Sequence, residues 1–148
     1  MNTTKVFFIV TLILIVGGTH NLKAQNCTLT VDIEGTANTK GTLLVGLYKN
    51  QKNYLSETYM GQEVTAQTDR IKVNFKDVEP GEYAIAVIHD TNQNGKFDKN
   101  FFGIPKEGYG FSNHTPNFGS ADYEEARFEV KSTNTNKVSV KMGYVGPR

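Results

Sequence analysis

Residues 71–88 read IKVNFKDVEPGEYAIAVI, and this stretch decides the fold. Residues 71–76 alternate isoleucine, valine and phenylalanine with lysine and asparagine, the period of two that is typical of a strand with one buried face. Pro80-Gly81 then marks a turn. Residues 82–88 are almost continuously apolar, so we expect a central strand covered on both faces. The stretch therefore predicts a β-hairpin in an all-β protein.

The same alternation continues on both sides of the hairpin. It predicts further strands at residues 28–34, 41–48, 123–130 and 137–142, whereas residues 50–67 are polar and irregular, with room for a short helix or a crossover. Helical periodicity is almost absent. With about seven strands in one run, the sequence predicts an antiparallel β-sandwich of Greek-key type.

The N-terminus has the features of a signal peptide. Lys5 is followed by an apolar run over residues 6–16, which is shorter than the roughly twenty residues that a membrane span needs. A polar stretch then ends at Ala24, where we expect cleavage. This predicts a signal peptide at residues 1–24, a single β-sandwich domain at residues 25–148, and a periplasmic, secreted or cell-surface location.

The charge of the mature chain argues against nucleic acid or an anionic membrane surface as a partner. The full sequence has 16 basic and 15 acidic residues; without Lys5 and Lys23 the balance becomes 14 against 15, a net charge of −1. The remaining lysines are scattered among acids, so the chain lacks a continuous basic field. We expect no nucleic-acid binding and no insertion into a membrane.

The sequence contains one cysteine, Cys27, so no intramolecular disulfide can form. A cysteine close to a signal-peptide cleavage site is also a candidate for lipid attachment. The preceding residues, Ala24-Gln25-Asn26, do not fit the usual lipoprotein signal. We therefore favour an unmodified thiol near the mature N-terminus.

Residues 89–98, HDTNQNGKFD, follow the central strand and have the composition of a calcium loop. Calcium binds about six to eight oxygen atoms, which a loop provides when oxygen-bearing groups stand at alternate positions around a glycine. Gly95 supplies the turn, and Phe101 stands where an EF-hand has its last glutamate. The alternative is a plain turn rich in Asn and Asp. The predicted ligands are Asp90, Asn92, Asn94, the backbone carbonyl of Lys96, and Asp98.

A further carboxylate is needed to complete such a site. Glu107 and Asp122 lie in loops downstream, and either could fold back onto residues 90–98. With Asp90 and Asp98 as the only carboxylates in the loop itself, we expect a Kd on the order of 10⁻⁴ to 10⁻³ M, as in extracellular calcium modules.

Several motifs, and their order along the chain, resemble those of a bacterial family of secreted domains, the domain-of-unknown-function family 2141. The resemblance covers residues 28–142 and rests on residues 80–84, 89–98, 103–113, 118–119 and 123–126. It implies a fold and no established activity. The Pro-Gly-x-Tyr motif is similar to that of transthyretin-like (prealbumin) and collagen-adhesin-repeat-like sandwiches, some of which hold calcium in a comparable loop.

Residues 103–113 combine glycines with Tyr109 and Phe111 and allow two interpretations. They form either a surface that binds a ligand or partner, or a loop that packs on itself and closes one end of the sandwich. We favour the self-packed loop.

The alternative function is a small hydrolase or a zinc protein. His89 and His114 could act with nearby polar residues, namely Asp90, Glu107 and Ser112. However, the sequence has neither an H-E-x-x-H nor a G-x-S-x-G motif, and residues 144–148 do not match the C-terminal signature of the transthyretin-like hydrolases. The prediction is therefore an exported, non-enzymatic calcium-binding module that has a structural role or binds an extracytoplasmic protein or cell-surface partner.

Overall fold

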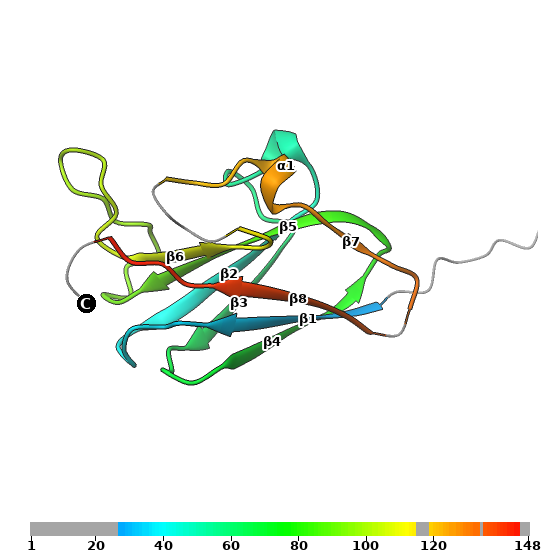
Figure 1. Cartoon of the computed structure of the whole chain (residues 1–148), viewed down its shortest axis with the longest axis horizontal. Coiled ribbons are helices and arrows are strands. Elements are labelled where there is room, and N and C mark those ends of the chain that lie inside the picture. The colour runs from blue at the N-terminus through cyan, green and yellow to red at the C-terminus, as the bar shows by residue number, and fades with distance from the viewer. Residues whose placement is uncertain (1–26, 115–118, 134, 146–148) are drawn as a thin grey trace, which may run out of the picture.

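The computed structural model describes residues 27–114, 119–133 and 135–145 of the 148-residue chain. The predicted signal peptide, residues 1–24, lies outside the described residues. Within them the chain forms eight strands and two short helical segments (Figure 1). The strands are β1 (Cys27–Glu34), β2 (Thr42–Tyr48), β3 (Met60–Thr65), β4 (Ile71–Val78), β5 (Gly81–Asp90), β6 (Gly108–Phe111), β7 (Phe128–Val130) and β8 (Thr135–Lys141); the helical segments are the 3₁₀-helix η1 (Gln51–Asn53) and α1 (Tyr123–Ala126).

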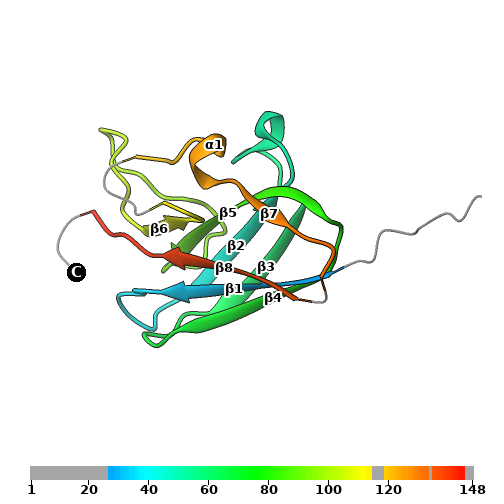
Figure 2. The ribbon, with the colours of Figure 1, turned by 45° about the vertical axis from the view of Figure 1, so that its right-hand side comes forward.

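The strands form the two sheets of a β-sandwich, as predicted. One sheet has the order β4-β1-β8 and the other the order β3-β2-β5-β6, with β7 pairing with the start of β5. In Figure 2, β1 and β8 run across β2 and β3 of the other sheet. The pairing is antiparallel, as predicted, except between β1 and β8, which are parallel.

Strands β4 and β5 do not form the predicted hairpin, because they belong to different sheets. Glu79 and Pro80 connect them, just after Asp77 near the end of β4, whose φ of 58° is left-handed, and the Tyr83 hydroxyl donates to the Glu79 carbonyl at 2.9 Å. Phe75 of β4 and Tyr83 of β5 are both fully buried in the core between the sheets. Alternation correctly identifies the buried face of each strand. It does not distinguish hydrogen-bonded neighbours from strands that face each other across a core.

The main core fills the space between the two sheets. Strand β1 contributes Leu29, Val31 and Ile33, all fully buried, and β5 contributes every second residue from Tyr83 to Val87. Burial of this apolar area, at about 25 cal/mol per Å², is the main force that holds the sheets together.

A second apolar cluster covers the outer face of the five-stranded sheet. Ala84 and Ala86 of β5 pack with Tyr109 and Phe111 of the neighbouring strand β6 and with Tyr123 of α1. Figure 1 shows α1 and the segment around η1 above this face. Strand β5 is therefore buried on both faces, as predicted, and the alanines on its outer face leave room for large aromatic side chains.

Residues 123–130 do not form one strand, which corrects the prediction for this segment. They form the single turn α1 and then β7, because Tyr123 and Ala126, three residues apart, are buried while Glu124 and Glu125 between them are exposed. This spacing follows a helical turn and places both buried side chains on one face.

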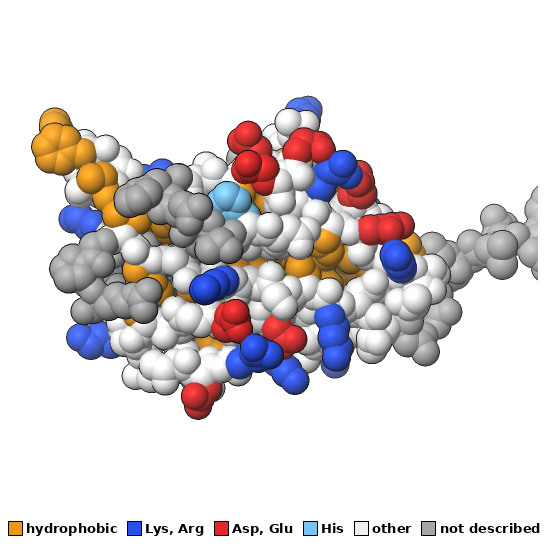
Figure 3. Space-filling model, viewed as in Figure 1, with side chains coloured by type: hydrophobic (Ala, Val, Ile, Leu, Met, Phe, Trp, Pro, Cys, Tyr) orange, Lys and Arg blue, Asp and Glu red, His pale blue; other side chains and the backbone are white. Residues whose placement is uncertain are grey.

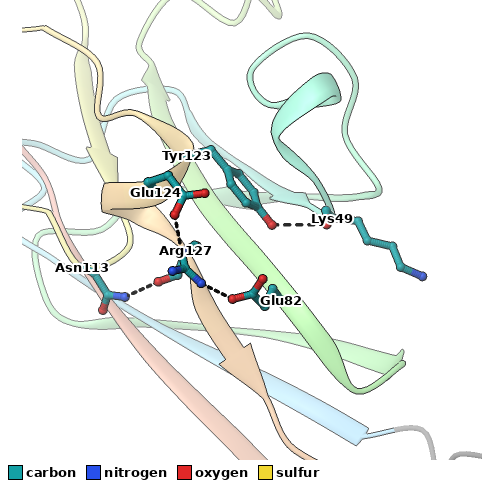
Figure 4. A network of polar contacts seen from close by, with 6 residues as sticks. All are labelled: Lys49, Glu82, Asn113, Tyr123, Glu124 and Arg127. Carbon is teal, nitrogen blue, oxygen red and sulfur yellow. Dashed lines mark hydrogen bonds and ion pairs between the residues drawn. The ribbon is translucent and has the colours of Figure 1, made fainter.

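Polar contacts of Arg127 join α1 to the sheet (Figure 4). The guanidinium pairs with Glu82 of β5, and its Nε lies 2.7 Å from Glu124. The Arg127 carbonyl accepts from the Asn113 side chain at 2.8 Å, and the Tyr123 hydroxyl donates to the Lys49 carbonyl at 3.3 Å. These exposed ion pairs add little free energy each but fix where α1 lies.

Residues 50–67, predicted to be irregular, contain η1 and the edge strand β3. The Asn50 side chain accepts from the Asn53 backbone N–H at 3.0 Å, which begins η1. Most residues of β3 are exposed, so the strand has none of the alternation that would have identified it from the sequence.

Candidate cation site at the end of β5

The predicted calcium loop leaves the sheet where β5 ends at Asp90, which is paired with Thr42 of β2. Gly41 makes this exit possible: a Cβ atom there would lie 2.0 Å from the Asp90 carbonyl oxygen, and its φ of 71° is left-handed. The loop therefore begins from a rigid strand that is fixed by its neighbour.

Asp90 shapes the first part of the loop. Its side chain is 1 % exposed, and its two carboxylate oxygens accept from the backbone N–H groups of Asn94 at 3.1 Å and Gly95 at 2.7 Å. Gly95 has a φ of 71°, a conformation that glycine adopts without strain. The sequence feature predicted to turn the loop does so, with the Asp90 carboxylate at its centre.

Two of the predicted ligands, Asn92 and Asn94, converge on one oxygen atom of a third, Asp98. Oδ2 of Asp98 accepts from the side-chain amides of Asn92 at 2.7 Å and Asn94 at 2.9 Å. The amide oxygens in turn accept from the backbone, Asn92 from the N–H of Asn94 at 3.2 Å and Asn94 from the N–H of Lys96 at 2.8 Å. The loop therefore gathers its polar side chains toward a single point beside Asp98.

The sequence predicted either Glu107 or Asp122 as the missing carboxylate, and Glu107 is the one that reaches the loop. Its side chain is 4 % exposed, and it accepts from the N–H of Thr91 at 3.2 Å and of Asp98 at 3.0 Å. Glu107 thus links the first and last residues of the loop. Asp122, the other candidate, begins α1, where its own N–H donates to Glu125 at 3.0 Å.

The donor set fits a hard cation with modest affinity. Carboxylate, amide and carbonyl oxygens are the groups that calcium prefers. Rotating an Asn side chain by half a turn exchanges its N–H₂ for its oxygen, so Asn92 and Asn94 can present either group toward Asp98. Among the described residues, no group of three or more His, Cys, Asp or Glu side chains is placed to hold a metal ion. A cation held here would therefore need the amide oxygens and the Lys96 carbonyl oxygen as well as carboxylates.

His89, a candidate for catalysis or zinc binding, is fully buried with both ring nitrogens in hydrogen bonds. Nε2 lies 2.7 Å from the Lys40 carbonyl, which can only accept, so Nε2 carries the proton in this network. Nδ1 lies 2.8 Å from the Tyr144 hydroxyl, which also accepts from the N–H of Ala37 at 3.0 Å. His89 therefore holds the end of β5 against two distant segments of the chain.

His114 lies elsewhere, beside the ring of Phe111. Because Phe111 is paired with Ala86, three residues before His89 along β5, the two histidines are separated by about 10 Å of strand. They do not share a site.

Ser112, another residue of the enzymatic alternative, is fully buried. Its Oγ accepts from the N–H of Ile85 at 2.9 Å and donates to the Ala126 carbonyl. Ser112 thus fills the break between β6 and β7 along the edge of β5. Its proton is directed at a backbone carbonyl, which is a structural role.

Two glycines of residues 103–113, Gly108 and Gly110, have a packing explanation, and part of this run is strand β6 rather than loop. A Cβ atom at Gly108 would lie 2.2 Å from the Tyr144 ring, and one at Gly110 would lie 2.7 Å from the Lys141 carbonyl oxygen. Tyr109 and Phe111 are buried, at 3 % and 6 % exposure. The self-packed interpretation is therefore correct for these two aromatic residues.

Cys27 begins β1 and is buried, with its Sγ donating to the Lys131 carbonyl at 3.1 Å. A lipid attached to this sulfur would require the first residue of the strand to leave the core.

Sequence reasoning missed Tyr144, which contacts both His89 and Ala37. No local pattern marks this residue, because its partners lie 55 and 107 positions away. The only related signal is Gly108, whose missing side chain makes room for the Tyr144 ring.

Together, the fold and the loop define a class of small β-sandwich domain in which a loop of Asp, Asn and Gly residues leaves a central, doubly covered strand. Within that class, the chain belongs to the family described as "uncharacterized protein conserved in bacteria", the domain of unknown function 2141, whose model matches residues 31–138. No curated protein and no solved structure matches the chain. In the described part of the chain, no helix is long and apolar enough to cross a membrane.

Proposed function

We propose that this protein is an exported, calcium-binding β-sandwich module with a structural or interaction role, in the periplasm or at the cell surface, and not an enzyme. The calcium ion binds in the loop of residues 90–98. The observation that carries the proposal is the convergence of Asn92 and Asn94 on Oδ2 of Asp98.

Two amides donating to one carboxylate oxygen form an arrangement that a cation can replace. When the amides rotate, their oxygens leave the backbone N–H groups of Asn94 and Lys96 and face the same point as Asp98, and the ion takes the place of the two N–H donors. Asp90 and Glu107 hold the backbone of the loop through its N–H groups and remain in place. Binding therefore needs little movement of the main chain.

The expected affinity is that of a module exposed to abundant calcium, with a Kd on the order of 10⁻⁴ to 10⁻³ M. At a free calcium concentration about thirty times the Kd, a ligand that binds only the folded state stabilises it by about 2 kcal/mol. For a domain of this size, that raises the Tm by about 5 °C or more.

The test is thermal unfolding of the mature protein after chelation, followed by addition of calcium, magnesium or zinc. We expect calcium to raise the Tm and to give a saturable heat of binding in titration calorimetry. Asp98→Asn should abolish most of that rise, because it removes the carboxylate on which the amides converge. Asp69→Asn is the matched control, since Asp69 is exposed in a different turn.

The proposal is wrong if calcium does not raise the Tm of the natural sequence, or if Asp98→Asn responds to calcium as strongly as Asp69→Asn. A stabilisation by zinc that exceeds that by calcium would also overturn it, because zinc prefers imidazole and thiolate to amide and carbonyl oxygen.

A further inference from the structure

The segment that follows the cation loop forms a small projecting hairpin over residues 98–106. Lys99 and Pro105 are paired in an isolated bridge, and the N–H of Lys106 donates to the Asp98 carbonyl at 2.9 Å. Figure 1 shows this segment standing away from the body of the sandwich at the upper left. Its tip, residues 100–104, makes no part of either core cluster.

The tip exposes large apolar side chains to an unusual degree. Phe101 is 97 % exposed, Phe102 82 % and Ile104 44 %. Leu55 and Tyr59 are the other exposed large hydrophobic residues of the described chain, and both are less than half exposed. In Figure 3 the end of the projecting loop is orange, which marks hydrophobic side chains. The domain buries its other aromatic residues far more fully, so this exposure is a local exception.

The backbone of the tip is held in a defined conformation. The Asn100 side-chain oxygen accepts from the N–H of Phe102 at 2.9 Å and of Ile104 at 3.0 Å, while the Asn100 backbone N–H donates to the Ile104 carbonyl at 2.8 Å. Gly103 supplies the left-handed residue of the turn with a φ of 77°. Four backbone polar groups of the tip are therefore satisfied without help from the rest of the domain or from a cation.

These hydrogen bonds matter because a turn enters an apolar environment at low cost only when its backbone polar groups keep their partners. A convex tip with two adjacent phenylalanines is also too small to supply the roughly 800 Å² per partner of a stable protein interface. A lipid surface needs no complementary shape. The geometry therefore favours a bilayer over a protein as the occupant.

The mature chain as a whole has no continuous basic field, but the local charge at the base of the hairpin supports the same choice. Lys96, Lys99 and Lys106 are exposed at the base of the hairpin, whereas two of the nearby acids, Asp90 and Glu107, are buried and bonded to backbone N–H groups. The base lies about three residues from the tip, a rise of about 10 Å in extended chain. That distance matches the depth of roughly 5–10 Å at which apolar side chains of surface-bound proteins enter the headgroup boundary.

We propose that Phe101, Phe102 and Ile104 insert into the interface of an anionic bilayer, with the lysines at the base of the hairpin on the lipid phosphates. The domain docks on the surface and does not span it. Because the hydrogen bonds of Asn100 hold the tip, docking does not require calcium. The inference thus goes beyond the calcium proposal and can fail separately from it.

The first test is co-sedimentation of the mature protein with lipid vesicles in the presence of a chelator. We expect binding to vesicles of phosphatidylcholine mixed with phosphatidylglycerol, and weaker binding to phosphatidylcholine alone. Phe101→Ser combined with Phe102→Ser should lower the partition coefficient by about 100-fold, and Lys99→Glu by about 5-fold or more. Leu55→Asn is the matched control, because it removes another exposed apolar side chain at a position whose φ of 58° suits asparagine.

A second measurement locates the tip directly. The sequence contains no tryptophan, so Phe102→Trp places a single fluorescent reporter at the tip. We expect its emission to shift to shorter wavelength when anionic vesicles are added, and a quencher carried on the lipid to reduce it. An emission that anionic vesicles leave unchanged would overturn the proposal. Vesicle binding that the double serine variant retains would also contradict it. The same holds if the protein does not bind vesicles but uses the tip to associate with itself or to capture another protein.

Discussion

Two regions cover strand β5, and they are stabilised by opposite kinds of chemistry. Residues 90–107, named the acidic loop for the buried carboxylates of Asp90 and Glu107 although its three acids and three lysines balance, close the end of the strand. The two buried carboxylates accept from backbone N–H groups. The aromatic cover, formed by Tyr48, Tyr54 and Tyr123, packs above its outer face, with successive ring centroids 5.4 and 5.6 Å apart in edge-to-face contact.

The difference predicts which agents act on each region. Calcium and changes of charge act on the acidic loop, because its free energy lies in charge-assisted hydrogen bonds and in the groups that a cation would bind. The aromatic cover depends on apolar burial and ring geometry, which metal ions do not alter. If the two regions are energetically independent, substitutions in one leave the response of the other unchanged.

The largest expected effect comes from removing the ring of Tyr123, which is 7 % exposed in the aromatic cover. Tyr123→Ala should lower the free energy of unfolding by about 3–4 kcal/mol, because it leaves a cavity beneath α1. Chemical denaturation measures this loss. Tyr123→Phe, the matched control, removes only the 3.3 Å hydrogen bond to the Lys49 carbonyl and should cost less than about 1 kcal/mol.

The calcium response of the Tyr123→Ala variant tests the comparison itself. We expect the same rise in Tm on addition of calcium as for the natural sequence. A response that disappears with the ring would show that the two regions form one cooperative unit.

The intermediate effect is expected at Glu107, in the acidic loop. Glu107→Gln keeps the volume of the side chain but replaces one of its two acceptor oxygens with a donor, which then faces the N–H of Thr91 or of Asp98. The free energy of unfolding should fall by about 2 kcal/mol, since a buried N–H loses its partner. Glu63→Gln, on the exposed edge strand β3, is the control and should change stability by less than about 0.5 kcal/mol.

The calcium response of Glu107→Gln is expected to weaken as well, because the loop that Glu107 holds at both ends supplies the ligands. If Glu107→Gln destabilises the protein yet leaves the calcium response intact, Glu107 supports the fold alone and the acidic loop is not one functional unit.

Much of this comparison could be predicted from the sequence because local patterns determine it. Alternation located β1, β2, β4 and β8, and the apolar run of residues 82–88 identified a strand covered on both faces. The loop of residues 89–98 was identified by its composition, and Glu107 was one of two downstream acids expected to reach it. In each case the signal lies within about ten residues of the feature or follows from residue type.

What the sequence did not predict depends on contacts between distant segments. The assignment of β4 and β5 to different sheets is decided by pairing with β1 and β2, which alternation cannot reveal. Strand β6 was concealed by its glycines, whose role is the close approach of Tyr144 and Lys141. His89 was a catalytic candidate by residue type alone, and only its contacts with Lys40 and Tyr144 identify it as structural.

The smallest expected effect concerns Tyr54. At neutral pH its substitution should not lower the free energy of unfolding, unlike the two substitutions above. Among the described residues its buried hydroxyl finds no hydrogen-bond partner. Tyr54→Phe should therefore leave stability unchanged or raise it by up to about 1 kcal/mol, since a polar group that loses its bonds to water is removed. Tyr59→Phe is the control, because Tyr59 is 40 % exposed.

Alkaline pH allows a sharper test of Tyr54. Burial raises the pKa of Tyr54 above its ordinary value of 10.0, and the neighbouring Tyr48 raises this pKa further. The folded state then resists ionisation while the unfolded state ionises freely above pH 10, so the contribution of Tyr54 is complete below pH 10 and is lost as the pH rises toward the folded-state pKa. Tyr54→Phe should lose less stability between pH 9 and pH 11 than the natural sequence, as urea denaturation at each pH would measure. Equal losses in the two proteins would mean that the Tyr54 hydroxyl is hydrated in the folded state, and that this part of the aromatic cover is open to water.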